Sequence, residues 1–452
     1  MLAYSSPEEV VFGKSKHPVK CGFNVVIGDG EVIPEVNFTL PSVKVCRDNL
    51  REIRKLFRDI TTRVLMKCVE LSQEQVVVEL EHVFEMTQDP QFGAVVTKDI
   101  KETMAEFHEK YGLRSALRVT VADIRHRTRP PRMRNGEEVE KVFESFRMCA
   151  DAGADILSIE STGGKEITDR AIVEGDVEAI LFVLGVMAIK DMEFLWREIV
   201  NISKRFGVVP GGDTACGFAN TAMQLANMGM IPRVMAALVR LASVPRSYIA
   251  VKMGAKGPLK DCGYENPAIK MLCGVPISME GKASACAHSS PLGNIAAATC
   301  DLWSNESVQD VKLLGGNAPE VFTEILIYDC RLMNTAAKKS RAFEFRDLLV
   351  ASDKYLDPQA LMLDPDLMYR AAQIVENVKD PYHQVVETAK LVVDTISQEA
   401  KEGRLRLTDS ERRWLGKLED TVYNMPSDWS EILEHVEKRY EGFFLMEEYG
   451  LP

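Results

Sequence analysis

Short apolar runs alternate with amphipathic segments through the middle of this chain, and this alternation constrains the fold more than any other feature. Between about residues 73 and 340, seven runs predict strands: QVVVELEHV, ALRVTVADI, ADILSIES, FGVVPGGD, SYIAVKMG, VPISMEG and VKLLGGNAP. Amphipathic segments such as EEVEKVFESFRMCADAG and DMEFLWREIVNISKRFG separate them and predict helices. Repeated strand–helix units require parallel strands, because each crossover returns the chain to the same end of the sheet.

The number of strands favours fold class α/β with a (β/α)8 TIM barrel. AILFVLGVMAI at residues 179–189 is the candidate for the eighth strand. The same run is too short to span a bilayer, and a buried helix is the better interpretation of it. An open doubly wound sheet is the alternative, but no GxGxxG motif follows an early strand. The barrel is therefore the preferred prediction.

Two further segments flank the predicted barrel of residues 73–340. Residues 1–72 form an N-terminal extension, in which CGFNVVIG and EVIPEVNFTLP predict a hairpin around GDG and DNLREIRKLFRDITTRVLMKCVELS predicts a helix. Residues 341–452 are charged and helical in pattern, with a capping box from Thr408 to Glu411. We expect this C-terminal helical segment to pack on the barrel or at a subunit interface.

Composition and charge argue against several classes of protein. The formal net charge of −12 disfavours a nucleic acid or an anionic membrane as partner. The opening sequence MLAYSSPEEVVFGKSKHP lacks the basic region and apolar block of a secretory signal. The ten cysteines are scattered singly without a CxxC pair, which is typical of reduced thiols in the cytoplasm. We therefore expect a cytoplasmic protein.

Three residues at predicted strand ends form a candidate metal site. Glu160 in DILSIESTGG, Cys216 in PGGDTACGFAN and Cys262 in GPLKDCGYENP each follow an apolar run. In a barrel, side chains just past the carboxyl ends of the strands converge on one face. One carboxylate and two thiolates would bind zinc and leave the fourth coordination position open, as in a catalytic site.

The same residues also have a structural interpretation, in which Glu160 caps a helix and the two thiols pack in the core. A further thiol competes for the role of ligand. Cys286 in ASACAHSS follows a predicted strand, and its neighbour His288 would complete a metal-binding or nucleophile–base pair. Spacing alone leaves these interpretations open.

Motifs along nearly the whole chain carry a resemblance to one known family: LAYSSPEEVVFGKSKHPVK, GEVIPEVNFTLP, DIRHRTRPPRMRNGEE, SIESTGGKE, VMAIKDMEFLW, GGDTACGFANTA, GPLKDCGYENP and GKASACAHSSPLGN. The chain resembles the zinc-containing subunit of methanol:corrinoid methyltransferases, which begin methanol use in methanogens and acetogens. The resemblance implies a (β/α)8 barrel with one zinc ion on Glu160, Cys216 and Cys262. Cys273 and Cys286 are the alternatives to Cys262.

The resemblance also implies a reaction and a partner. Zinc would act as a Lewis acid on methanol, whose hydroxide is a poor leaving group. The methyl acceptor would be the cobalt(I) corrinoid of a partner protein, since this chain lacks the DxHxxG signature of cobalamin domains. The family assembles two zinc and two corrinoid subunits into a heterotetramer, which implies a homodimer of this chain at its core.

A proton on the departing oxygen would assist this reaction, because three anionic ligands weaken the Lewis acidity of the metal. Asp213, three residues before Cys216, is the candidate catalytic residue. Asp261, Glu265 and Glu280 are further candidates, and each of these carboxylates also suits a role in orienting the ligands.

Two other functions stay open at this point. One is a related zinc-dependent corrinoid methyltransferase that acts on a methoxylated aromatic or another methyl donor. The other is a non-catalytic scaffold subunit for the corrinoid protein. The arginine-rich loop IRHRTRPPRMRNG is either held by local carboxylates or forms a rim patch that meets the corrinoid or an acidic partner face.

Overall fold

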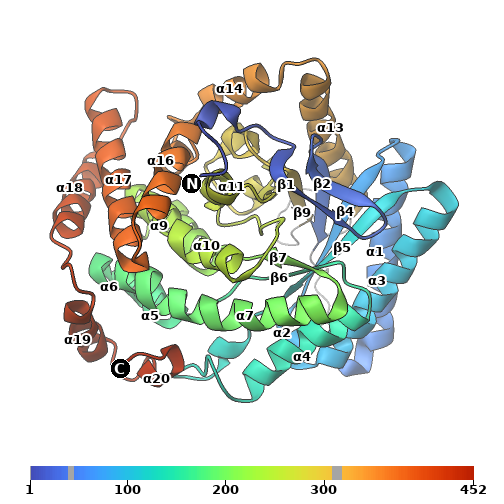
Figure 1. Ribbon diagram of the computed structural model, residues 1–452, viewed down its shortest axis with the longest axis horizontal. Helices are drawn as coiled ribbons and strands as arrows, with labels where there is room; N and C mark the ends of the chain where they lie inside the picture. The colour runs from blue at the N-terminus through green and yellow to red at the C-terminus, as the bar shows by residue number, and fades with distance from the viewer. Residues whose placement is uncertain (1, 39–44, 308–317) are drawn as a thin grey trace.

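The parallel strands form the wall of one barrel (Figure 1). The computed structural model describes residues 2–38, 45–307 and 318–452. Seven strands pair in parallel in the order β7-β6-β5-β4-β3-β9-β8. Their bounds are β3 Ile33–Phe38, β4 Gln75–Glu81, β5 Arg114–Val121, β6 Ile156–Ile159, β7 Val209–Gly212, β8 Ser278–Glu280 and β9 Leu302–Ser307. Because β3 belongs to this sheet, the barrel begins within the segment expected to be an N-terminal extension.

Residues 256–260 take the eighth position of the barrel and close the gap between β7 and β8. The first two N–H groups of this segment donate to carbonyl oxygens of β7, each at 2.8 Å. On the other side, Leu259 forms a parallel bridge with Ile277, directly before β8. Pro258 has no N–H and Gly257 has a φ of 80°, so the segment cannot form a regular ladder. The expected (β/α)8 barrel is confirmed, with one irregular wall segment.

The run SYIAVKMG, which predicts a strand, is instead part of a helix. It lies in α10 (Val244–Met253), so this strand prediction is wrong. Pro245 stands in the first turn of the helix, and Gly254 ends it with a φ of 118°. Proline at the start and glycine just past the end are helix signals, and they outweigh the apolar run between them.

The run AILFVLGVMAI is also helical, so the eighth strand does not lie there. It continues from α6 (Val177–Phe182) through a π-helical turn into α7 (Ala188–Phe206). The Asp176 carboxylate caps α6 by accepting from the Ala179 N–H at 3.1 Å. The run is buried on all sides, so it shows no amphipathic period. Its alternative interpretation as a buried helix is confirmed.

The run VKLLGGNAP at residues 311–319 lies almost entirely outside the described residues. The last strand of the barrel, β9, comes directly before it and was not among the predicted strands. Its sequence LWSNES is mostly polar, because its inward face lines the barrel mouth.

Helices surround the barrel, and the C-terminal helices extend along one side of it (Figure 1). The expected helix near residue 50 is confirmed as α1. Residues 341–452 pack against α6, α9, α10 and α11 through α16, α17, α18 and α19. The remaining bounds are α1 Leu50–Glu70, α2 Phe84–Gln88, α3 Pro90–Tyr111, α4 Glu137–Asp151, α5 Lys165–Glu174, α8 Thr221–Asn227, α9 Arg233–Ala242, α11 Asn266–Cys273, α12 Lys282–Ala287, α13 Pro319–Lys338, α14 Ala342–Asp353, α15 Pro358–Leu361, α16 Pro365–Asn377, α17 Pro381–Lys401, α18 Asp409–Tyr423, α19 Ser430–Arg439 and α20 Met446–Tyr449.

A two-stranded hairpin covers the amino end of the barrel. β1 (Lys14–Cys21) pairs with β2 (Val25–Asp29) in antiparallel register, so the hairpin expected around GDG is wrong. Gly28 and Gly30 have φ values of 87° and 108°, and they turn the chain from β2 into the barrel strand β3. The apolar residues of the hairpin and of the strand starts form one buried cluster: Cys21, Val25, Ile27, Ile33, Val77, Ala116, Ile156 and Leu302.

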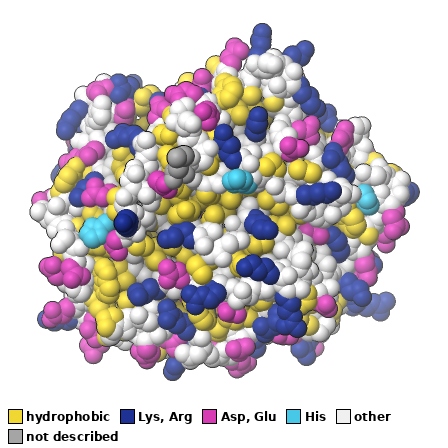
Figure 2. All heavy atoms as spheres, in the orientation of Figure 1, with side chains coloured by type: hydrophobic (Ala, Val, Ile, Leu, Met, Phe, Trp, Pro, Cys, Tyr) yellow, Lys and Arg dark blue, Asp and Glu magenta, His cyan; other side chains and the backbone are white. Residues whose placement is uncertain are grey.

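The surface carries both signs of charge. Figure 2 shows Lys and Arg side chains interspersed with Asp and Glu over the face in view. One helical stretch, Arg233–Met253, is long and apolar enough to cross a membrane by length and composition. Of its most apolar window 89% is buried inside the protein, as expected for a core helix.

The middle of the barrel is polar and charged. Arg118 of β5 and Glu35 of β3 are fully buried, and Arg118 Nε lies 2.6 Å from Glu35 Oε1. Arg118 also donates to Ser158 Oγ at 2.9 Å, and Ser278 Oγ donates to Glu35 Oε2 at 2.6 Å. Strands β3, β5, β6 and β8 are therefore joined by one network of side chains.

We expect Arg118→Met to lower the free energy of unfolding by about 3–5 kcal/mol, because it leaves the Glu35 carboxylate buried without its counter-charge. The double variant Arg118→Met, Glu35→Gln should recover much of this loss. Urea denaturation followed by circular dichroism measures both. The control Arg170→Met breaks a partly exposed pair with Glu174 and should cost less than about 1 kcal/mol. Equal losses in the single and double variants would contradict the explanation.

Candidate metal centre

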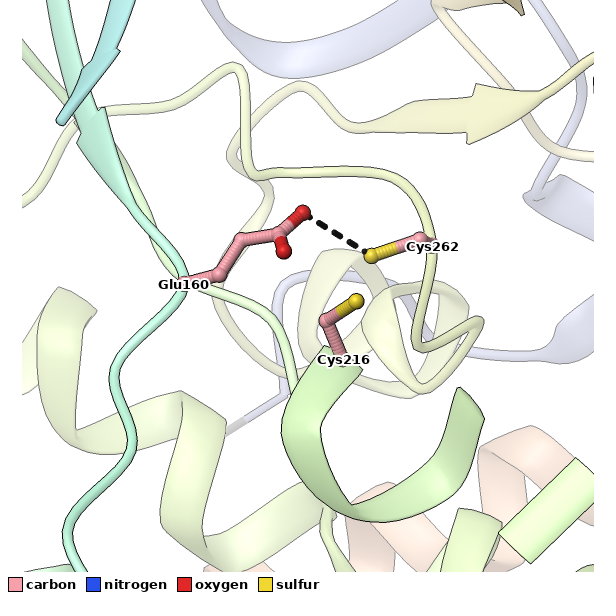
Figure 3. Close-up of side chains that lie close together, drawn as sticks. All are labelled: Glu160, Cys216 and Cys262. Carbon is pink, nitrogen blue, oxygen red and sulfur yellow. Dashed lines mark hydrogen bonds between the residues drawn. The ribbon is translucent and has the colours of Figure 1, made fainter. Parts of the chain in front are cut away.

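Glu160, Cys216 and Cys262 converge at the carboxyl end of the barrel. Glu160 follows β6, Cys216 begins the turn after β7, and Cys262 follows the wall segment 256–260. These are three consecutive positions of the barrel wall, so their side chains meet. Figure 3 shows the carboxylate and both thiols pointing toward one another. Their ligand atoms all lie within 4.8 Å of each other, and Cys262 Sγ donates to Glu160 Oε1 at 3.1 Å.

The two alternative cysteines lie elsewhere. Cys273 ends α11, where its thiol donates to the Ile269 carbonyl at 3.0 Å. Cys286 is exposed on α12. His288 Nδ1 and Nε2 lie 2.8 and 3.0 Å from carboxylates, so neither ring nitrogen is directed to Cys286 in the described contacts. The geometry therefore groups Cys262, rather than Cys273 or Cys286, with the other two candidate ligands.

The electrostatics of the trio suit a cation. Loss of solvation, followed by the nearby Glu81 carboxylate, raises the pKa of Glu160. A hydrogen bond from Cys262 favours the Cys216 thiolate, but desolvation and Glu160 outweigh it and raise the pKa of Cys216 to about 12. Burial, the Cys216 thiol and the Glu160 carboxylate raise the pKa of Cys262 well above its usual range. A divalent ion would reverse these shifts, because it stabilises the anionic form of every ligand.

The buried ammonium of Lys260 lies among four carboxylates beside the trio. Its Nζ is 2.5 Å from Glu79 Oε1, 3.6 Å from both Glu160 Oε1 and Asp261 Oδ1, and 3.8 Å from Glu81 Oε2. Burial opposes the ammonium, but the carboxylates, led by Asp261 and Glu79, raise the pKa of Lys260 well above its usual range. Lys260 therefore stays charged and holds the carboxylates together.

Lys260, Glu79 and Glu81 are not among the site residues predicted from the sequence. The signal for the two glutamates is present in QVVVELEHV, where they alternate with Val78 and Leu80 and so share one face of β4. That face points into the barrel, and burial raises the pKa of Glu79 to about 8. No short-range pattern marks Lys260, because its wall segment is irregular.

Asp213 joins the loops that carry Glu160 and Cys216. Its Oδ1 accepts from the N–H groups of Ser161 at 3.2 Å and Thr214 at 2.8 Å, and its Oδ2 accepts from Trp196 Nε1 at 2.9 Å. Arg246 Nη2 lies 3.4 Å from Oδ1. Both carboxylate oxygens are therefore engaged with donors, which favours a positioning role for Asp213. The catalytic role expected from the sequence stays a prediction.

Glu265 joins the loops that carry Cys216 and Cys262. The Glu265 carboxylate, which follows Cys262 by three residues, accepts from the Ala215 N–H at 2.7 Å and from Ser247 Oγ at 2.5 Å. Gly263 N–H donates to Thr214 Oγ1 at 2.8 Å. A Cβ on Gly263 would lie 2.3 Å from Thr214 Oγ1 and 2.9 Å from the Ala215 nitrogen, so only glycine permits this approach of the two loops.

A second cluster lies on the other side of the barrel mouth. His288 Nδ1 lies 2.8 Å from Glu280 Oε1, and His288 Nε2 lies 3.0 Å from Glu306 Oε2. Tyr264 OH donates to Glu280 Oε2 at 2.6 Å. Burial opposes the imidazolium, but its hydrogen bonds with Glu280 and Glu306 raise the pKa of His288 to about 12.

The arginine-rich loop is held by local contacts. Arg125 is fully buried and forms ion pairs with Asp123 at 2.8 Å and Asp191 at 2.7 Å. Arg134 Nη2 donates to the Tyr449 carbonyl at 2.9 Å, and Glu448 accepts from the Arg134 N–H at 2.8 Å. These contacts support the interpretation of a loop tied down by carboxylates and by the C-terminal residues.

The chain is similar to known proteins over its whole length. It matches the family model described as Methanol-cobalamin methyltransferase B subunit over residues 1–450. It is 37% identical over 457 residues to the Methanol--corrinoid protein co-methyltransferase of Methanosarcina barkeri, covering 99% of this chain and 98% of that protein. A chain in the crystal structure of the methanol:cobalamin methyltransferase complex MtaBC from Methanosarcina barkeri superimposes with a TM-score of 0.93 at 37% identity, covering 100% of this chain and 99% of that one.

We expect Glu265→Gln to weaken metal binding at Glu160, Cys216 and Cys262 by about 10–100-fold, because it loosens the contact between two of the ligand loops. Competition with a chromophoric zinc chelator measures the affinity. The control Glu109→Gln removes an exposed carboxylate of α3 and should leave the affinity unchanged. An unaltered affinity in Glu265→Gln would show that this carboxylate does not position the ligands.

Proposed function

The chain belongs to the methanol-cobalamin methyltransferase B subunit family and transfers the methyl group of methanol to a corrinoid protein, and from this premise we propose that Glu160, Cys216 and Cys262 hold one zinc ion that activates the methanol. Family membership favours methanol over a methoxylated aromatic as methyl donor. It also favours an enzyme over a scaffold subunit.

The convergence of one carboxylate and two thiols is the observation that carries this proposal. Thiolate ligands favour zinc over harder divalent ions, and three protein ligands leave a position for substrate. When bound, zinc supplies the Lewis acidity that stabilises negative charge on the alcohol oxygen as the C–O bond breaks. The donor set of the chain therefore fits the metal that its family resemblance implies.

The neighbouring residues set the geometry of the ligands. Asp213 and Glu265 fix the three ligand loops relative to one another through backbone N–H groups. Lys260 holds a positive charge 3.6 Å from Glu160 Oε1, which orients that carboxylate and offsets the surrounding negative charge. We assign Asp213 a positioning role, since all its contacts are with the scaffold of the site.

The corrinoid is carried by a separate protein. The related crystal structure is of a complex named methanol:cobalamin methyltransferase MtaBC, and this chain corresponds to one of its chains along its full length. No DxHxxG signature occurs in the sequence. We propose a complex of two zinc and two corrinoid subunits around a homodimer of this chain. Its ten cysteines are all free, which suits a reducing cytoplasm.

We expect Cys216→Ser to contain less than one zinc ion per chain and to lose methyl transfer from methanol to cob(I)alamin by more than about 100-fold, because a direct ligand matters more than its outer partners. Zinc is measured by elemental analysis, and methyl transfer is measured by the absorbance of the corrinoid.

Cys286→Ser is the matched control, because it removes an exposed thiol near the barrel mouth. It should keep both zinc and activity. Size-exclusion chromatography with the corrinoid protein should show that Cys216→Ser still forms the complex. A Cys216→Ser enzyme with normal zinc content and normal turnover would refute the assignment of the ligands.

A further inference from the structure

The second cluster at the barrel mouth brings together a donor set that differs from the thiolate trio. Glu280 ends β8, Glu306 lies near the end of β9, and His288 follows α12. One ligand atom from each of these residues lies within 4.8 Å of the others. Glu280 is buried, and Glu306 and His288 are half-buried, so the cluster is only partly open to solvent.

Asn37 lies on the strand next to this cluster and carries an unpaired acceptor. It is the register partner of Glu306 on the neighbouring parallel strand, so both side chains point into the barrel. Asn37 is 4% exposed, and its Nδ2 donates to Glu81 Oε2 at 2.8 Å. Its Oδ1 is buried and has no hydrogen-bond donor among the described residues. Most buried polar atoms are paired, so a buried oxygen without a protein donor, next to carboxylates, suits a water or a cation.

We propose that Glu280, His288, Glu306 and Asn37 Oδ1 form a second binding site for a divalent first-row cation such as Mn²⁺. The site is separate from the thiolate trio and independent of the zinc proposal.

The donor atoms select a harder ion than the trio does. Carboxylate and amide oxygens with one imidazole nitrogen suit Mn²⁺ or Fe²⁺, whereas the thiolates of Cys216 and Cys262 suit zinc. Without a metal, the His288 imidazolium directs one proton to Glu280 and the other to Glu306, and binding of the ion displaces one of these two protons. The imidazole releases that proton to solvent, and its nitrogen lone pair coordinates the ion.

A buried tyrosine, Tyr264, fixes one of the proposed ligands from inside the barrel. Tyr264 OH donates to Glu280 Oε2 and fixes the carboxylate, as outer partners of metal ligands do. Tyr264 is fully buried and has a φ of 62°, a strained conformation for a non-glycine residue. Because Tyr264 follows Cys262 by two residues, the same loop supports both clusters.

Glu81 lies between the two sites. It accepts from Asn37 on one side and lies 3.8 Å from Lys260 Nζ on the other, and Lys260 in turn reaches Glu160. The mouth of the barrel would thus hold two cations of different character, joined by one carboxylate and one ammonium.

The test uses the full-length protein with zinc already bound. Mn²⁺ is added, and the free ion is measured by its solution electron paramagnetic resonance signal. We expect one Mn²⁺ per chain, with binding at least about tenfold weaker in Glu280→Gln and in Glu306→Gln. His383→Gln is the matched control, because His383 forms an exposed pair with Asp380 at 2.8 Å and should leave binding unchanged.

A second measurement on the unmodified protein does not depend on the folding of any variant. Pulsed electron paramagnetic resonance of the bound Mn²⁺ should show one directly coordinated imidazole nitrogen. Absence of tight Mn²⁺ binding, equal binding in Glu306→Gln and the unmodified protein, or bound Mn²⁺ without a coupled nitrogen would each overturn the proposal. The cluster would then be an imidazolium bridging two carboxylates.

Discussion

The closure of the barrel by residues 256–260 is the constraint on which the active end of the molecule depends. This segment replaces a regular strand between β7 and β8. Every second residue after Pro258 then lies at the mouth of the barrel. Lys260 lies among the carboxylates, Cys262 completes the trio with Glu160 and Cys216, and Tyr264 donates a hydrogen bond to Glu280. Gly263, between Cys262 and Tyr264, makes the glycine-dependent contact with the loop that carries Cys216.

The interior of this barrel departs from the branched apolar layers that usually fill such folds. In the part of the barrel that the structure describes, apolar side chains gather at the amino end, and the pair of Arg118 and Glu35 occupies the middle. Toward the mouth the charge becomes predominantly negative, with Lys260 and His288 as the buried or half-buried cations among the carboxylates. Buried charges of this kind contribute little net stability compared with apolar packing. Near the mouth these charges contact one another and Glu160, and so they restrict the positions of the side chains there.

Much of the fold could be predicted from local patterns, and the exceptions have physical causes. The strands β4, β5, β6 and β8 are short apolar runs bounded by turns, and they were predicted. β9 was missed because its polar residues face the barrel mouth. α10 was mistaken for a strand because its apolar run YIAV is short. The run of α6 was considered both as a strand and as a buried helix, because a helix buried on all sides loses its period. The eighth wall segment contains Pro258 and Gly257, which are signals of a loop.

Some residues of the candidate site could be predicted from the sequence, and others could not. Glu160 and Cys216 were predicted because each follows a run that is a barrel strand. Cys262 was placed after the run SYIAVKMG, which is helical, so its grouping with the other two depended on the family resemblance. Lys260 and the cluster around His288 were not assembled, because their meaning depends on which strands become neighbours. His288 in particular was grouped with Cys286 by sequence proximity, whereas the fold turns it toward Glu280 and Glu306.

The β1–β2 hairpin has a consequence for access to the candidate metal centre. Cys21, Val25 and Ile27 fill the amino end of the barrel with apolar side chains. Glu160, Cys216 and Cys262 lie at the opposite, carboxyl end. A hairpin that contacts none of these three residues therefore leaves the carboxyl end as the side from which a small molecule approaches them.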